Sequence, residues 1–148
     1  MNFMKGDGAA FIDTNILAYA FDESDEKRRR PCVEIVRAGF QGETTYYLSN
    51  QVLSELFVVL TKHVGKPLSK EKAAVIVSGF ADSSKWRKLN YTHLTIKRAM
   101  QDLQTISTSF WDILIAETMR ETGIKRVYTE NEKDFAKIPW IQIENPLP

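Results

Sequence analysis

The stretch FIDTN (Phe11–Asn15) carries an apolar segment directly into three small polar residues. The segment AAFID (residues 9–13) is short and apolar and ends in turn-forming residues, which predicts a buried β-strand. Asp13, Thr14 and Asn15 suit a turn or a helix N-cap, because their side-chain oxygens accept hydrogen bonds from nearby backbone N–H groups. They suit equally well the start of an active site at the end of a strand. The rest of the chain has to distinguish these two interpretations.

The remaining segments alternate between strand and helix patterns, without a linker or an internal repeat that would indicate a second domain. Their order favours an α/β sandwich with a mainly parallel sheet, formed by residues 1–148 as one domain. The predicted helices cover residues 16–21, 26–40 with Pro31 in an early turn or at a kink, 51–63, 70–80 after a Ser69 cap, 93–104 after a Thr92 cap, and 109–122 before Gly123. The predicted strands that follow the first one cover residues 44–50, 86–91, 125–131 and 141–144.

Composition limits the class of protein. The 148 residues include one cysteine, Cys32, so that neither an internal disulfide nor a cysteine-rich zinc site is expected. Uninterrupted apolar runs such as Leu56–Leu60 are far shorter than the roughly 20 residues of a membrane-spanning helix. We therefore expect a soluble cytoplasmic protein without a membrane contact.

Charge is nearly balanced, with 20 Lys and Arg against 19 Asp and Glu. The overall charge therefore does not indicate a nucleic-acid partner. One dense basic run, Lys27, Arg28, Arg29 and Arg30, is typical of a solvated helix face, and it would also suit contacts with phosphates.

Several acidic and amide side chains occupy positions that are expected to meet. Asp13 and Asn131 follow predicted strands, and the carboxyl ends of parallel strands share one edge of a sheet, where ligands bind. Glu55 has Val52, Val58 and Val59 at neighbouring helical positions, so its carboxylate is expected to need a partner or a cation unless that helix face is exposed.

The remaining two candidates have simpler explanations as well. Asp112 is the third residue after a Ser109 cap, where a carboxylate can satisfy backbone donors and the helix dipole. The segment YTENEKDF (residues 128–135), which contains Thr129, Asn131 and Asp134, has the composition of a polar turn.

If these carboxylates converge, their mutual repulsion predicts a bound cation. Two carboxylates about 4 Å apart repel by roughly 4 kcal/mol at an effective dielectric constant near 20. Ligands that are all oxygen favour Mg²⁺ or Mn²⁺ over zinc. A carboxylate-bound Mg²⁺ commonly takes phosphate oxygens as further ligands, so phosphodiester hydrolysis is the chemistry to expect.

Four segments together resemble the PIN-domain ribonucleases, and among these the toxin subunits of VapBC-type toxin–antitoxin pairs. The segments are FIDTNIL, SNQVLSEL, SFWDILIAETMRETG and VYTENEKDF, and the resemblance extends over nearly the whole chain. It implies a PIN-like α/β/α sandwich with a mainly parallel sheet of four or five strands. It also implies a metal-dependent endoribonuclease, with Mg²⁺ or Mn²⁺ as cofactor.

The resemblance also assigns roles to individual residues. Catalytic and metal-binding roles fall on Asp13, Glu55 and Asp112, with Asn131 at the position where the family usually has a fourth acid, and with Asp134 at the rim as a further metal ligand. Thr14, Asn15 and Thr129 would orient a carboxylate or a metal-bound water. RNA phosphates would be held by Lys27–Arg30, or by Lys85, Arg87 and Lys88.

The expected partners are RNA, an antitoxin protein and a second copy of the chain in a homodimer. Apolar residues such as Phe57, Phe80 and Trp86 could form contact surfaces, although such residues more often belong to the core. Two alternatives to the nuclease remain open. One is a phosphatase with Asp13 as covalent nucleophile, although such enzymes usually have a second aspartate where this chain has Asn15. The other is a catalytically weak PIN-like module that binds RNA or protein, which the Asn131 departure favours.

Overall fold

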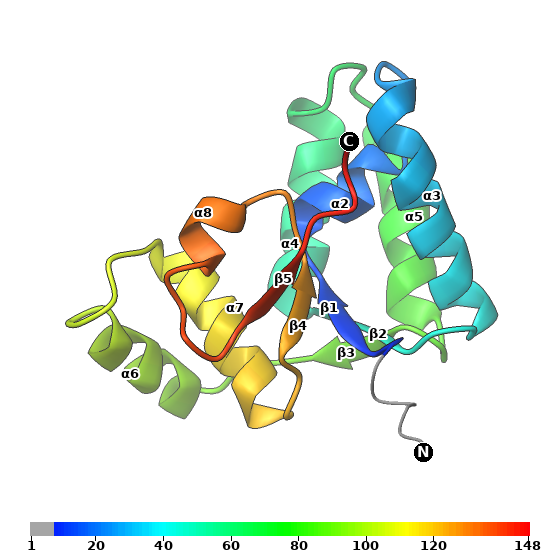
Figure 1. Cartoon of the computed structure of the whole chain (residues 1–148). Helices are drawn as coiled ribbons and strands as arrows, with labels where there is room; N and C mark the ends of the chain where they lie inside the picture. The colour runs from blue at the N-terminus through cyan, green and yellow to red at the C-terminus, as the bar shows by residue number, and fades with distance from the viewer. Residues whose placement is uncertain (1–7) are drawn as a thin grey trace.

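The computed structural model describes residues 8–148 and has five strands and seven helices in this range (Figure 1). Within this range no helix is both long enough and apolar enough to cross a membrane. The elements in chain order are β1 (Ala10–Ile12), α2 (Thr14–Tyr19), α3 (Glu26–Gln41), β2 (Tyr46–Ser49), α4 (Asn50–Lys62), α5 (Lys70–Asp82), β3 (Arg87–Leu89), α6 (His93–Asp102), α7 (Phe110–Glu121), β4 (Arg126–Tyr128), α8 (Glu132–Phe135) and β5 (Gln142–Glu144).

All five strands form one parallel sheet in the order β3-β2-β1-β4-β5. This confirms the predicted α/β class and the parallel sheet. The chain runs outward from β1 through β2 to β3 and then returns to the other side of β1 for β4. The strand order therefore reverses between β1 and β4, and in open parallel sheets ligands bind at such a point, outside the carboxyl ends of the strands.

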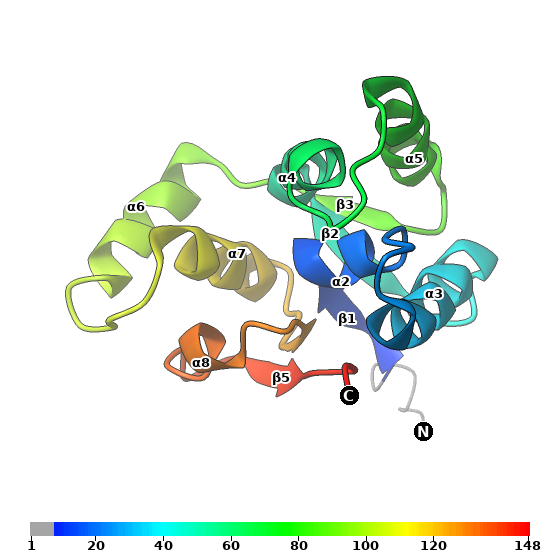
Figure 2. The ribbon, with the colours of Figure 1, turned by 90° about the horizontal axis from the view of Figure 1, so that it is seen from above.

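Helices cover both faces of the sheet. Connections between parallel strands are right-handed, so the segments that lead from β1 to β3 and those that lead back to β4 lie on opposite faces. In the view of Figure 2, α6, α7 and α8 lie on one side of the sheet, and α3 and α5 lie on the other. The result is the three-layer α/β/α sandwich that the sequence resemblance implies.

Most helix starts agree with the predicted caps. The side chains of Ser69, Thr92 and Ser109 each accept a hydrogen bond from a backbone N–H in the first turn of the following helix. Gly123 follows α7 with a φ of 77°, a left-handed conformation that favours glycine at a helix end.

Several element ends differ from the predicted ones by one to three residues, and two differences lie next to the site. Helix α2 begins at Thr14 and not at Ile16, because the Asp13 side chain caps it by accepting a hydrogen bond from the Thr14 N–H. Residues 132–135, which were expected to form a polar turn, form the short helix α8. The first difference matters for the site, since it places Thr14 and Asn15 in the first turn of a helix.

The core next to β2 is built around an aromatic cluster. Trp86 and Phe80 are almost fully buried, with their ring centroids 5.1 Å apart, and Phe40 and Tyr46 complete the cluster. Trp86 and Phe80 are therefore core residues, as is more common for such side chains, and they do not form an exposed contact surface. The Trp86 ring packs so closely on α3 that a Cβ at Gly39 would lie 2.4 Å from its Cζ2 atom.

This packing leads to a prediction about two helical glycines. We expect Gly39→Ala to lower the free energy of unfolding by about 1–3 kcal/mol, because the added methyl group overlaps the indole ring. A Cβ at Gly79, in α5, has no heavy atom within 4 Å outside the local helix backbone, so Gly79→Ala should raise the free energy of unfolding by about 0.5–1 kcal/mol. Urea unfolding of both variants measures the two effects, and equal shifts in the same direction would contradict the packing of Trp86 on Gly39.

Candidate active site

A cavity of about 540 Å³ opens where the carboxyl ends of the strands meet the helices. It receives side chains from α2, α4 and α7 and from the segment after β4. Its lining residues are Asp13, Thr14, Asn15, Ser54, Glu55, Val58, Val59, Asp112 and Asn131. The structure thus brings the three carboxylates expected from the sequence to one cavity.

Asp13 directly follows the central strand β1 and is buried, with 6% of its surface exposed. Its carboxylate accepts hydrogen bonds from the Thr14 N–H at 2.8 Å, the Thr129 hydroxyl at 2.8 Å and the Asn15 side-chain amide at 3.0 Å. Burial raises the pKa of Asp13 above its ordinary value, the nearby Glu55 charge raises it further, and the three hydrogen bonds act in the opposite direction. Asp13 is thus a buried carboxylate held in one orientation by neutral donors.

Glu55 lies on α4 and faces Asp13 across Thr14. The Thr14 hydroxyl donates to Glu55 Oε1 at 2.9 Å, and the Gln51 amide donates to Oε2 at 3.4 Å. The environment of Glu55 is less apolar than the three neighbouring valines suggested. Val52 is buried, but Val58 is 45% exposed and lines the cavity. Glu55 therefore lies on the exposed edge of an apolar helix face.

Asp112 is the third residue of α7, as predicted, but no backbone N–H of the described residues donates to its carboxylate in a hydrogen bond. The carboxylate instead accepts a hydrogen bond from the Asn131 side-chain amide at 2.8 Å. Burial, followed by the charges of Asp13, Asp134 and Glu55, raises the pKa of Asp112 to about 7, while the Asn131 hydrogen bond lowers it. A capping role therefore does not explain why an aspartate occupies position 112, because the nearby carboxylates disfavour its charged form.

The segment after β4 supplies two neutral donors. Thr129 is buried, and its hydroxyl donates to Asp13 while it accepts a hydrogen bond from the Asn131 N–H at 2.9 Å. Asn131 precedes α8 but makes no side-chain capping bond there, so its amide is available to Asp112. An amide therefore stands beside Asp112 at the position where the resemblance implies a fourth acid.

Asp134 does not line the cavity. Its backbone carbonyl accepts a hydrogen bond from the Thr108 hydroxyl at 3.1 Å. Its charge is nevertheless near enough to raise the pKa of Asp112. Asp134 thus acts on the cavity through its charge and does not face into it.

The basic run lies on the first turns of α3, outside the cavity. Arg28 pairs with Asp25 and Arg29 pairs with Glu26, at 2.8 and 3.0 Å, whereas Lys27 and Arg30 line a separate hollow beside the C-terminal residues Pro146 and Pro148. In the alternative basic group, the Lys88 ammonium donates to backbone carbonyls at the end of α5, which leaves Lys85 and Arg87 as the exposed cations of that group.

Sequence reasoning placed Val58 and Val59 beside Glu55 but predicted no role at the site for four residues near the carboxylates. They are Gln51, which bonds Glu55, and the cavity-lining residues Ser54, Val58 and Val59. Helical spacing is the signal that could have identified them, because Gln51 and Val59 lie four residues before and after Glu55 on one face of α4, and Ser54 and Val58 share the adjoining face.

The oxygen ligands at this cavity are of the kind that a hard divalent cation prefers. The protein side chains alone do not surround such an ion. No three His, Cys, Asp or Glu side chains among residues 8–148 are placed to hold one ion together. Mg²⁺ is usually held by one or two carboxylates together with waters and substrate phosphates, so a cage is not required. Burial and the neighbouring carboxylates raise the pKa of Asp13 and of Asp112, so a cation placed between them would favour their charged forms. The residues therefore fit an ion that water and substrate would partly ligate.

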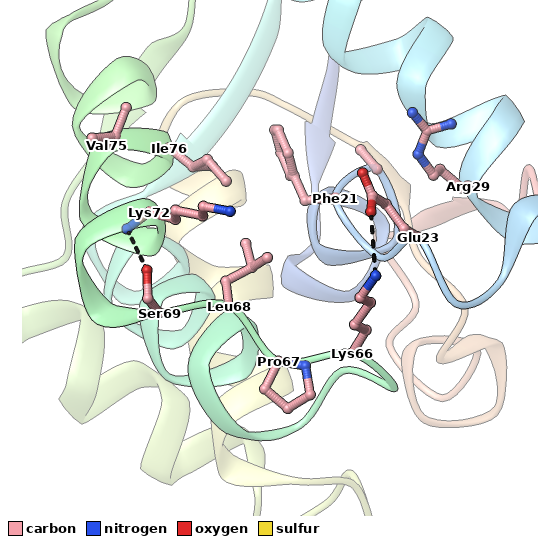
Figure 3. A pocket seen from close by; sticks show the side chains of 11 residues that line it. Phe21, Glu23, Arg29, Lys66, Pro67, Leu68, Ser69, Lys72, Val75 and Ile76 are labelled. Atoms are coloured by element: carbon pink, nitrogen blue, oxygen red, sulfur yellow. Dashed lines mark hydrogen bonds and ion pairs between the residues drawn. The ribbon is translucent and has the colours of Figure 1, made fainter.

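A second cavity, of about 560 Å³, lies between the end of α2, α3 and α5 (Figure 3). Phe21, Leu68 and Ile76 form apolar walls, and Glu23 forms an ion pair with Lys66 at 3.9 Å. Glu23 is its only acidic lining residue. Carboxylate chemistry therefore belongs to the cavity around Asp13.

Another charged group lies between α6 and α7. Glu117 is 2% exposed and forms ion pairs with Arg98 and Arg120 at 3.6 and 3.5 Å. Burial and the adjacent Asp102 carboxyl group raise the pKa of Glu117 to about 7. This group links two packed helices and contributes no side chain to the cavity around Asp13.

Comparison with known proteins identifies the family of this chain. The PIN domain matches residues 10–141, and the chain belongs to the PIN domain family. No curated protein matches the sequence.

Solved structures share the fold at low identity. VapC20 of Mycobacterium tuberculosis, a sarcin–ricin loop cleaving toxin, is 21% identical with a TM-score of 0.68, over 86% of this chain and 93% of that one. A toxin–antitoxin complex from Klebsiella pneumoniae is 23% identical with a TM-score of 0.64, over 93% and 97%. DNA-bound VapBC from Salmonella typhimurium is 24% identical with a TM-score of 0.61, over 93% and 98%. Together they show that this chain has the fold of VapC-type toxins.

Proposed function

We propose that the protein is a metal-dependent endoribonuclease and the toxin of a toxin–antitoxin pair. The observation that carries the proposal is the convergence of Asp13, Glu55 and Asp112, from three separate elements, on one cavity at the switch point of the sheet. Family membership and the VapC-type fold support the same reaction class. Phosphodiester hydrolysis is the chemistry that such a group of oxygen ligands serves best.

The chain's own residues would divide the work as follows. Asp13, Glu55 and Asp112 would hold one or two Mg²⁺ or Mn²⁺ ions, with water and substrate phosphates as the remaining ligands. Such an ion, when bound, neutralises charge that develops on a phosphate and makes water more acidic. The Thr129 hydroxyl and the Asn15 amide hold the Asp13 carboxylate in one orientation, so that it is already positioned before the reaction begins.

Asn131 and Asp134 take lesser parts in this proposal. The Asn131 amide orients Asp112, and its carbonyl oxygen is a neutral ligand without charge of its own. Asp134 adds negative charge behind Asp112, which favours a cation in the cavity. Thr14 joins the site by donating to Glu55 from the first turn of α2.

The proposal extends to partners and location. Several structural neighbours are toxin–antitoxin complexes, which supports an antitoxin as the physiological partner of this chain. A homodimer and a cytoplasmic location belong to the same proposal. RNA is the proposed substrate, and its phosphates would contact the basic run Lys27–Arg30, of which Lys27 and Arg30 make no ion pair with the described residues.

A binding module without nuclease activity is the second candidate. The observation in its favour is that no three metal-binding side chains in the described part of the chain can hold one ion. The neutral Asn131 beside Asp112 points the same way.

Cleavage of a mixed RNA pool separates the two functions. We expect the purified protein to cut RNA with Mg²⁺ or Mn²⁺ and to stop in EDTA, and Asp13→Asn to reduce the rate at least 100-fold. Asparagine is an equally good helix N-cap, so this variant should keep α2 and the fold. The exposed Asp82→Asn, at the end of α5, is the matched control and should cleave at the unchanged rate. If both variants cleave at the wild-type rate, or if both lose activity equally, Asp13 has no specific role in the chemistry.

The basic run makes a separate prediction about RNA binding. In EDTA, the affinity of the Lys27→Ala/Arg30→Ala protein for a single-stranded RNA should depend less steeply on salt concentration. The slope should change by about 0.7 for each phosphate that the variant no longer binds. Lys70→Ala/Lys97→Ala removes the same charge from exposed positions on α5 and α6 and is the control. An unchanged slope in the first variant would place the RNA elsewhere.

A further inference from the structure

A smaller cavity, of about 150 Å³, adjoins the carboxylate cavity. The two cavities share Asn15 and Val59 in their walls and therefore lie side by side. The smaller cavity also has the side chains of Tyr19, His63 and Glu130 in its lining. None of these three residues has a part in the proposed hydrolysis, and no sequence motif singled them out as functional.

Asn15 ties this cavity to the reacting end of the site. Its amide donates to Asp13 Oδ2 at 3.0 Å, and its side-chain carbonyl accepts a hydrogen bond from the Glu130 N–H at 3.0 Å. One side chain therefore fixes the backbone of Glu130 relative to the Asp13 carboxylate. A group bound against Glu130 would be held at a defined place beside the scissile phosphate.

Of the two carboxylates in this cavity, only Glu130 is available to a ligand. Asp22 is buried, and its oxygens accept hydrogen bonds from the Ser24 N–H, the Ser24 hydroxyl and the Gly65 N–H, which join two loops. Glu130 is exposed, and among the described residues only Tyr19 donates to its carboxylate, at 2.9 and 3.1 Å. A carboxylate has about four acceptor positions, so Glu130 keeps free acceptors that Tyr19 does not use.

Tyr19 fixes the direction of that carboxylate. Burial and the neighbouring Glu130 raise the pKa of Tyr19 to about 12, so its hydroxyl stays protonated at neutral pH and acts as the donor. The Arg28 guanidinium lies 5.8 Å from the centre of the Tyr19 ring on the α3 side. The acceptor is therefore held in place before a ligand arrives.

We propose that this cavity binds the base of a nucleotide next to the scissile phosphate, and that Glu130 accepts a hydrogen bond from the exocyclic amino group of that base. The proposal rests on the proposed function, because it assumes RNA in the larger cavity. Two carboxylates repel a phosphate, whereas Val59, the Tyr19 ring and the His63 imidazole offer the flat and apolar surface that bases contact. Adenine, cytosine and guanine each offer an exocyclic amino donor at the edge of the ring. Uracil offers only its N3–H, which lies between two carbonyl oxygens that repel a carboxylate, so Glu130 should disfavour uracil at one flanking position.

Four single-stranded RNA oligonucleotides that differ only in the base at one flanking position test this inference, and a second set varies the base on the other side of the same phosphate. Binding is measured by fluorescence anisotropy with Mg²⁺ at one fixed salt concentration and over times shorter than that of cleavage, so that the readout is binding and no cleavage is needed for it. We expect the uracil oligonucleotide of one set to bind about tenfold more weakly than its adenine or cytosine counterpart. Glu130→Ala should remove the difference, and Tyr19→Phe should reduce it.

Glu132→Ala is the matched control, since it removes an exposed glutamate two residues away and outside the cavity. This control should keep the preference against uracil. The inference is overturned if the wild-type protein binds all four oligonucleotides equally, binds none, or keeps its preference in Glu130→Ala. Because the readout is binding, a protein that selects bases but does not cut RNA would contradict the proposed hydrolysis and leave the role of Glu130 supported.

Discussion

A buried carboxylate at the end of the central strand is the constraint on which the site depends. Burying Asp13 costs free energy, and neutral donors offset only part of that cost. The donor from β4 is placed by strand pairing, because Ile12 lies opposite Tyr128 and the Asp13 N–H bonds the Tyr128 carbonyl at 3.0 Å. Strand pairing therefore places the backbone of Thr129 beside Asp13, independently of the conformation of the loop that follows. The same parallel pair that forms the centre of the sheet thus builds the first part of the site.

The incomplete neutralisation of the cavity is consistent with function. Threonine, asparagine and glutamine side chains hold the carboxylates in place, yet burial and mutual repulsion still raise the pKa values of Asp13 and Asp112. A site selected only for stability would replace one of these acids with a neutral residue. Retained repulsion of this kind is typical of sites that exchange stability for activity. A bound cation would offset the repulsion, and the same hydrogen-bond donors would keep the carboxylates oriented toward it.

Local sequence patterns were sufficient to predict the architecture. Apolar runs that end in capping residues identified the strands and helices, and the Ser69, Thr92 and Ser109 caps lie where they were expected. Asp13 and Asn131 were predicted to lie close together because the carboxyl ends of parallel strands meet at one edge of the sheet. The shared site of Glu55 and Asp112 with Asp13 followed from the family resemblance, because both residues lie on helices. Periodicity could not show that Val58 faces a cavity, and it therefore suggested a more deeply buried Glu55 than the structure has.

Contacts between distant segments were the part that local patterns could not predict. The Thr129 to Asp13 bond joins residues 116 positions apart, and the Asn131 amide meets Asp112 only because β4 returns to the side of β1. The sequence left open whether Asp13, Thr14 and Asn15 form a cap or part of a site, and the helix was therefore started at Ile16. In the structure Asp13 does both, and α2 begins at Thr14. The cavity that contains Glu130 likewise depends on three separate segments of chain.

The most direct test of a cation site at these carboxylates is thermal unfolding with and without Mn²⁺. At a Mn²⁺ concentration 100 times the dissociation constant, binding should stabilise the wild-type protein by about 2.7 kcal/mol, which corresponds to a rise in Tm of roughly 5–10 °C. Asp112→Asn should unfold at a higher temperature than wild type in EDTA, because it removes one of the repelling charges, and should gain little from Mn²⁺. A wild-type Tm that Mn²⁺ leaves unchanged, or an equal rise in Asp112→Asn, would contradict the account.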